Sequence, residues 1–150
     1  MHRNAASDLG SVLALWQDVQ TLAADCDGRS AAVISAAPLP KLRALSLKYT
    51  VPRGEEWSIL ALSRTAAAGL QELHLSNIIG CPVLDIEAIR GYAQLRTLSI
   101  EGCNISDLGP LAGCVHLEVL ETCASYGSTD VSDIAPLGSC AKLKKLSIVA

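Results

Sequence analysis

A six-residue pattern, LxxLxL, recurs along this chain of 150 residues and limits its fold more than any other feature. Residues 42–47 and 70–75 match it fully, and residues 95–100 and 143–148 match it with isoleucine in the last place. A fifth copy, residues 117–122, ends in threonine. Successive copies begin 28, 25, 22 and 26 residues apart. Such a period indicates short solenoid repeats rather than one irregular globule.

The segments between the copies repeat as well. Residues 104–114 and 130–140 correspond position by position at a constant offset of 26, and residues 83–89 run in the same register without the proline. In all three, an aspartate stands ten residues before the next copy; these are Asp85, Asp107 and Asp133. Aspartate caps helix N-termini, and proline is tolerated in a first turn. We therefore expect each aspartate to be the N-cap of a short helical or 3-10 segment on the outer side.

The last two leucines of each copy lie on one face of a short strand, because side chains alternate along a strand. A single copy cannot bury them. Neighbouring copies must therefore stack, with their strands paired in parallel and their leucines aligned in files. The residues between the leucines point to the opposite face of the sheet.

On these residues the chain resembles the leucine-rich repeat family. Residues 95–114, which read LRTLSIEGCNISDLGPLAGC, are most similar to its short-repeat class, known from bacterial internalins and phosphatase-regulating proteins. The resemblance covers residues 42–148. It implies an α/β repeat solenoid, a right-handed arc with parallel strands on the concave face and short helices or 3-10 turns on the convex face. It also implies that the concave face holds another protein.

The first 41 residues follow the pattern less closely. Apolar residues at helical spacing after Ser7 and Asp8 predict a helix over residues 8–18. Residues 19–24 read as a degenerate strand, and residues 30–37 as an outer helix that Pro38 and Pro40 end.

The whole chain, residues 1–150, reads as a single leucine-rich repeat domain of about five to six repeats. Residues 55–68 are expected to form a longer, helix-like outer segment, and residues 124–129 a bulging loop. No polar cap follows the last copy, and an uncapped solenoid end exposes a strand edge and part of its core. We therefore expect the chain to be a fragment that lacks its C-terminal cap.

The residues that alternate with the leucines are the candidate partner-binding surface, together with the residues next to them. Tyr49 is the aromatic residue near the strand ends, where binding surfaces commonly carry an anchor. Ala44, Val119, Cys123, Ser147 and Val149 share the face. The partner-binding candidates are Arg43, Ser46, Lys48, Tyr49, Glu72, His74, Ser76, Arg96, Thr97, Ser99, Glu101, Glu118, Glu121 and Lys145.

His74 is also the candidate for catalysis, since the predicted register places it between Ser46 and Ser99, with Glu72 and Glu101 nearby. A hydrolase would need these groups within hydrogen-bond reach, an oxyanion site and a pocket. An open sheet supplies neither an oxyanion site nor a pocket, so we expect no catalytic residues and no enzymatic activity.

Composition excludes several other classes. A net charge of −3 argues against nucleic-acid binding, and no apolar run approaches the ~20 residues of a membrane span. The N-terminus shows no signal peptide, which favours a cytoplasmic protein. Gly-rich phosphate loops and other cofactor motifs are lacking, so no cofactor is expected.

The six cysteines contain no CxxC pair, and without an export signal free thiols are expected rather than disulfides. Cys114 and His116 alone make a weak zinc motif, so no metal is expected. Cys114 and Cys140 take equivalent repeat positions and are predicted in the core, and Cys123 is predicted to be exposed.

The predicted function is a non-enzymatic protein–protein interaction module that binds a protein partner of unknown identity on its concave face. The alternative is a structural scaffold segment of a larger multidomain protein or assembly whose activity lies outside this chain. Both follow from a repeat fold whose surface, rather than a pocket, is its distinctive feature.

Overall fold

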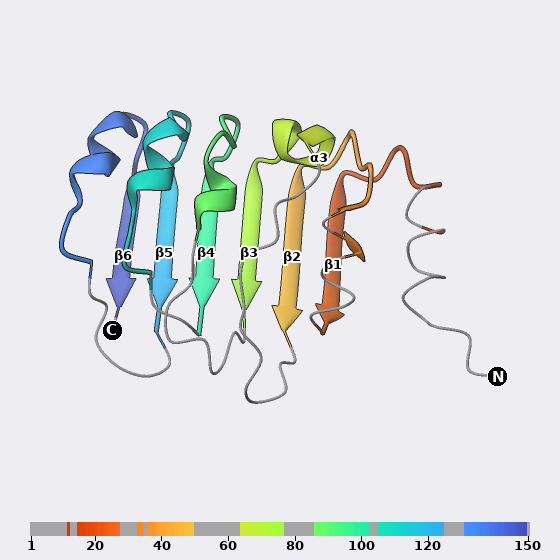
Figure 1. Cartoon of the computed structure of the whole chain (residues 1–150), viewed down its shortest axis with the longest axis horizontal. Coiled ribbons are helices and arrows are strands. Elements are labelled where there is room, and N and C mark those ends of the chain that lie inside the picture. The colour runs from red at the N-terminus through yellow and green to blue at the C-terminus, as the bar shows by residue number, and fades with distance from the viewer. Residues whose placement is uncertain are drawn as a thin grey trace.

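Six parallel strands form one sheet in which the order in space is the order in sequence. The computed structural model describes residues 12, 15–27, 33–34, 36–49, 64–76, 86–102, 105–124 and 131–149. The strands lie side by side along the molecule (Figure 1). They are β1 (Thr21–Cys26), β2 (Ala44–Tyr49), β3 (Glu72–Ser76), β4 (Thr97–Glu101), β5 (Val119–Cys123) and β6 (Lys145–Val149).

The pairing aligns the leucines of the LxxLxL copies in files, as predicted. One file runs through Leu22, Leu45, Leu73, Leu98, Leu120 and Leu146. A second file, two residues further along each strand, runs through Ala24, Leu47, Leu75, Ile100, Thr122 and Ile148. In β2 to β5 every member of both files is buried. This is the cooperative burial that a single copy could not achieve.

Short outer segments connect the strands. They are α3 (Arg64–Gly69) and the 3-10 turns η1 (Glu87–Ile89), η2 (Gly109–Gly113) and η3 (Ala135–Ser139). Parallel strands with such connections form the leucine-rich repeat arc that the sequence predicts. We number the coils 1 to 6 after their strands, and a coil here means a strand with the outer segment that precedes it.

Asp107 and Asp133 each lie one residue before the N-cap of a 3-10 turn, whereas the sequence predicts that they are the N-caps themselves. Leu108 and Ile134 are the N-cap residues of η2 and η3. Asp107 Oδ1 accepts a hydrogen bond from the backbone N–H of Gly109 at 2.7 Å, and Asp133 Oδ1 accepts one from Ala135 at 2.8 Å. Each carboxylate therefore accepts the first backbone N–H of the 3-10 turn that follows it. The aspartates cap the turns as predicted in kind, but from the position before the N-cap. Asp85 lies outside the described residues.

The N-terminal predictions need further adjustment. β1 overlaps the degenerate copy at residues 19–24, with its bounds displaced by two residues. The helix predicted to reach Asp18 does not, because residues 15, 17 and 18 form turns; most of its remaining length lies outside the described residues. Residues 33, 34 and 36 are helical, as predicted for the outer helix at 30–37.

Two other predicted segments fall largely outside the described residues. Of the outer segment at 55–68, residues 64–68 lie in α3 and residues 55–63 are outside. The predicted loop at 124–129 lies outside except for Ala124. None of the helices in the described part of the chain is long and apolar enough to cross a membrane.

Candidate functional site

The sheet face opposite the core carries three rows of side chains, and we call it the strand face. Because side chains alternate along each strand, the residues between the buried leucines all point to this side. Every residue in the three rows is exposed or half-buried. The first row is Thr21, Ala44, Glu72, Thr97, Val119 and Lys145; the second is Ala23, Ser46, His74, Ser99, Glu121 and Ser147; the third is Asp25, Lys48, Ser76, Glu101, Cys123 and Val149.

Most of the predicted partner-binding residues fall in these rows. The members are Ser46, Lys48, Glu72, His74, Ser76, Thr97, Ser99, Glu101, Glu121 and Lys145. Arg43, Arg96 and Glu118 instead stand one residue before their strands. Thr21, Ala23 and Asp25 also lie in these rows, although Val19 and Ala24 replace two leucines of the pattern in their copy and weaken its signal.

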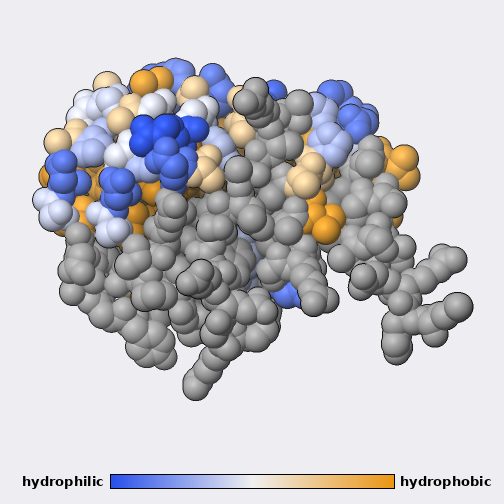
Figure 2. Space-filling model, viewed as in Figure 1, coloured by the Kyte–Doolittle hydropathy of each residue, from blue (hydrophilic) through white to orange (hydrophobic). Residues whose placement is uncertain are grey.

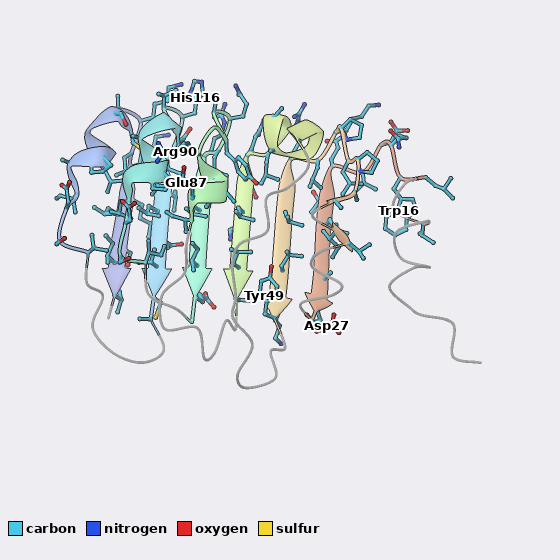
Figure 3. All side chains as sticks on the ribbon, in the orientation of Figure 1. Trp16, Asp27, Tyr49, Glu87, Arg90 and His116 are labelled. Atoms are coloured by element: carbon cyan, nitrogen blue, oxygen red, sulfur yellow. The ribbon has the colours of Figure 1, made fainter. Side chains whose placement is uncertain are left out.

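Tyr49 is wrongly placed by the sequence prediction. Its side chain is only 4% exposed and belongs to the hydrophobic core. Tyr49 follows Leu45 and Leu47 at two-residue steps, so the alternation of β2 turns it inward. Figure 3 labels it at the lower end of β2. The described rows of the strand face therefore contain no tyrosine or tryptophan.

The residues just before each strand form a row of their own, the strand-start row: Gln20, Arg43, Gln71, Arg96, Glu118 and Lys144. Its backbone is regular. The carbonyl of Arg96, for example, accepts the N–H groups of Glu118 and Val119 at 2.8 and 2.9 Å. In each pair of neighbouring coils, the carbonyl of the strand-start residue accepts two consecutive backbone N–H groups of the next coil. This regular pairing fixes the distance between neighbouring side chains of the row.

Charges alternate along the C-terminal half of the strand-start row. One carboxylate oxygen of Glu118 accepts Arg96 Nη1 at 3.1 Å, and the other accepts Lys144 Nζ at 2.6 Å. The hydrogen bond and positive charge of Lys144, followed by Arg96, lower the pKa of Glu118. Coils 4, 5 and 6 are thus joined by a chain of positive, negative and positive groups.

Ion pairs are sparser on the strand face itself. Lys145 Nζ lies 2.5 Å from Glu121 Oε1, and His74 Nε2 lies 3.9 Å from Glu72 Oε2. Glu101 makes no ion pair within the described part of the chain. Its carboxylate is exposed, as are the charged groups of Asp25 and Lys48 in the same row.

An open hollow of about 160 Å³ lies on the strand face over β4, β5 and β6. It is lined by Ser99, Ile100, Glu101, Glu121, Thr122, Cys123, Ser147 and Val149. Its rim is polar and partly acidic, since Glu101 and Glu121 flank serine hydroxyls. Sequence spacing placed six of these residues on the strand face, and Ile100 and Thr122 in the buried file. It carried no signal for the hollow, which depends on how the three coils stack.

The catalytic hypothesis for His74 gains no support from the geometry. Ser46 and Ser99 do lie beside His74 on adjacent strands, as predicted. Within the described residues, however, His74 makes no hydrogen bond to either hydroxyl, and its Nε2 lies 3.9 Å from Glu72 Oε2. A nucleophile held by a base is therefore missing from this arrangement.

Cys114, Cys123 and Cys140 fit their predicted places. Cys114 and Cys140 are 0% and 4% exposed, Cys123 is exposed, and all three are free. Burial raises the pKa of Cys114 to about 11, with a smaller contribution from Cys140. Burial also raises the pKa of Cys140, whose Sγ donates to the Leu111 carbonyl at 3.6 Å. These two thiols are packing groups, since a raised pKa and burial both suppress thiolate chemistry.

The outer side of the coils has its own charged pairs. Glu87 and Arg90 lie together on the outer turn before β4 (Figure 3), with Arg90 Nε 2.5 Å from Glu87 Oε1. Figure 2 shows that hydrophilic residues dominate the described surface over the turns of coils 4 to 6, with apolar residues visible below them. This side offers exposed charges for matched control substitutions.

No protein-family model matches the sequence, and no curated protein matches it. Among solved structures, the chain is similar to internalin C2 from Listeria monocytogenes, with 21% sequence identity and a TM-score of 0.39. The alignment covers 97% of this chain and 76% of that chain.

Proposed function

We propose that the chain is a non-enzymatic interaction module and that its strand face binds a protein partner. The observation that carries this proposal is the set of three aligned rows, in which every side chain is exposed or half-buried. A surface built from six strands in register is rigid. A partner therefore binds without the cost of ordering the side of the interface that this chain contributes.

The size of the hollow favours a macromolecular partner over a small molecule. Pockets for small ligands commonly enclose ~300–1,000 Å³, whereas this hollow measures about 160 Å³ and is open. A cavity of roughly 150 Å³ holds a group the size of benzene, so one partner side chain fits. Glu101 on its rim, which makes no ion pair within the described residues, favours a side chain with a positive charge or several hydrogen-bond donors.

A matched pair of charge reversals tests the proposal. Glu101→Lys changes the exposed carboxylate at the hollow, and Glu87→Lys changes an exposed carboxylate on the outer side. We expect wild type and Glu87→Lys to capture the same proteins from an extract of the source cells. Glu101→Lys should recover them at least about tenfold less, as expected for a disrupted central contact.

Circular dichroism and thermal melting of each variant provide the folding control. Quantitative mass spectrometry of the captured proteins supplies the measurement. The proposal is refuted if the folded Glu101→Lys variant captures the same proteins as wild type while Glu87→Lys loses them. That result would place the contact on the outer side.

A further inference from the structure

The third row of the strand face carries a negative charge that neither neighbour in the row balances. Asp25 and Lys48, which are opposite in charge, are paired in register on β1 and β2. Glu101 instead lies beside Cys123 in the register of β4 and β5, and it makes no ion pair within the described part of the chain. Coil 4 has a neighbouring coil on each side, so the exposure of this carboxylate does not depend on either end of the sheet.

The second carboxylate at the hollow already has a cationic partner. Glu121 Oε1 lies 2.5 Å from Lys145 Nζ on the next strand. The hydroxyls of Ser99 and Ser147, which also line the hollow, make no hydrogen bond within the described part of the chain. The hollow therefore presents the carboxylate of Glu101 and two hydroxyls as acceptors, which suits a cation that has several N–H donors.

The third row also gives the hollow a polar end and an apolar end. Glu101, Cys123 and Val149 are paired in register across β4, β5 and β6, and their side chains point to the same side. Neighbouring strands lie about 4.8 Å apart, so these side chains form a strip about 10 Å long. Its charged end is on β4, and its apolar end is Val149, which is 49% exposed. A long side chain with a charged head and an aliphatic stem matches this strip.

We propose that the hollow binds an arginine side chain of the protein partner, laid across the strands. The guanidinium pairs with Glu101 and donates to the hydroxyl of Ser99, and the aliphatic stem lies over Cys123 and Val149. A guanidinium suits this place better than an ammonium group, because its planar fork binds a carboxylate through two N–H groups, keeps further donors for a hydroxyl and is less strongly hydrated. This inference rests on the proposed function and names the side chain by which the partner is recognised.

Three peptides with blocked termini are the probes. They share the sequence Gly-Ser-Gly-Ser-X-Ser-Gly-Ser-Gly, in which X is arginine, lysine or citrulline, the neutral isostere of arginine. One side chain binds weakly, so nitrogen-15-labelled protein is titrated with each peptide to about 10 mM, which covers millimolar dissociation constants. The arginine peptide should shift the amide signals of Glu101, Cys123 and Val149. It should bind about fivefold more tightly than the citrulline peptide, the size of one exposed charge pair, with the lysine peptide between them.

Glu101→Gln should remove the difference between the arginine and citrulline peptides. Asp25→Asn is the matched control, because it removes a carboxylate charge from the same row outside the hollow, and it should leave the difference unchanged. The inference is wrong if the citrulline peptide binds wild type as tightly as the arginine peptide does. It is also wrong if Asp25→Asn reduces the preference as much as Glu101→Gln, since the attraction would then belong to the charge of the whole face.

Failure of this inference and failure of the proposed function give different results. If Glu101→Lys loses the captured proteins but the three peptides bind wild type equally, the strand face binds its partner through another side chain, and only this inference is wrong. If Glu101→Lys captures the same proteins as wild type, the proposed function itself is refuted, and the arginine contact to the partner is refuted with it.

Discussion

Single residues take their roles from their place in the alternation of a strand. Glu121 faces solvent, while its neighbour Thr122 is 3% exposed in the file of buried aliphatic residues. The hydroxyl of Thr122 has no hydrogen bond within the described part of the chain. A buried hydroxyl without a partner is unfavourable by about 1–3 kcal/mol. The degraded last position of the LxxLxL copy in β5 is thus a local weakness in an otherwise apolar file.

Cys114 provides a prediction of pH dependence. The pKa of this thiol is about 11 in the folded chain, compared with an ordinary value of 9.0. Below pH 9 both states keep the proton, and above pH 9 the unfolded state loses it first. The free energy of unfolding should therefore fall between pH 9 and 11, by about 2–3 kcal/mol from this group.

Urea denaturation of wild type, Cys114→Ala and Cys123→Ala at pH 7 to 11 measures this effect. Cys114→Ala should lower stability at pH 7 but remove the extra loss at high pH. Cys123→Ala, which alters an exposed thiol, should follow wild type. Parallel curves for wild type and Cys114→Ala would contradict the assignment.

At the scale of elements, the 3-10 turns depend on the aspartates that precede them. Removing the Asp107 carboxylate leaves the first N–H of η2 without its acceptor. We expect Asp107→Ala to lower the free energy of unfolding by about 1 kcal/mol, the usual value of such a group. Asp107→Asn keeps an acceptor oxygen and should lose less. Ser106→Ala, one residue earlier and exposed, is the control. If chemical denaturation gives the same loss of unfolding free energy for Ser106→Ala and Asp107→Ala, this role of Asp107 is refuted.

The elements also show how far sequence reasoning reaches. Spacing predicted the parallel files and the outer turns, because one coil can bury its leucines only against another. It misplaced Tyr49, because the two-residue step from Leu47 turns that side chain into the core. It could not find the hollow, because the hollow depends on which coils are neighbours in space. The partner-binding role of the strand face remains a prediction.

At the scale of the whole molecule, each coil contacts chiefly its neighbours. The free energy of unfolding is therefore approximately a sum of contributions from single coils and from the contacts between adjacent coils. The same substitution at equivalent positions should therefore have unequal effects. Leu120 is 0% exposed between coils 4 and 6, whereas Leu146 is 46% exposed at the edge. We expect Leu120→Ala to reduce the free energy of unfolding by about 3–4 kcal/mol, and Leu146→Ala by about 1 kcal/mol.

Urea denaturation followed by circular dichroism compares the two variants, and hydrogen exchange shows whether coil 6 opens before the rest. Local opening at the edge is expected, because only one side of β6 is packed. Equal losses for Leu120→Ala and Leu146→Ala would contradict the unequal packing of the two leucines.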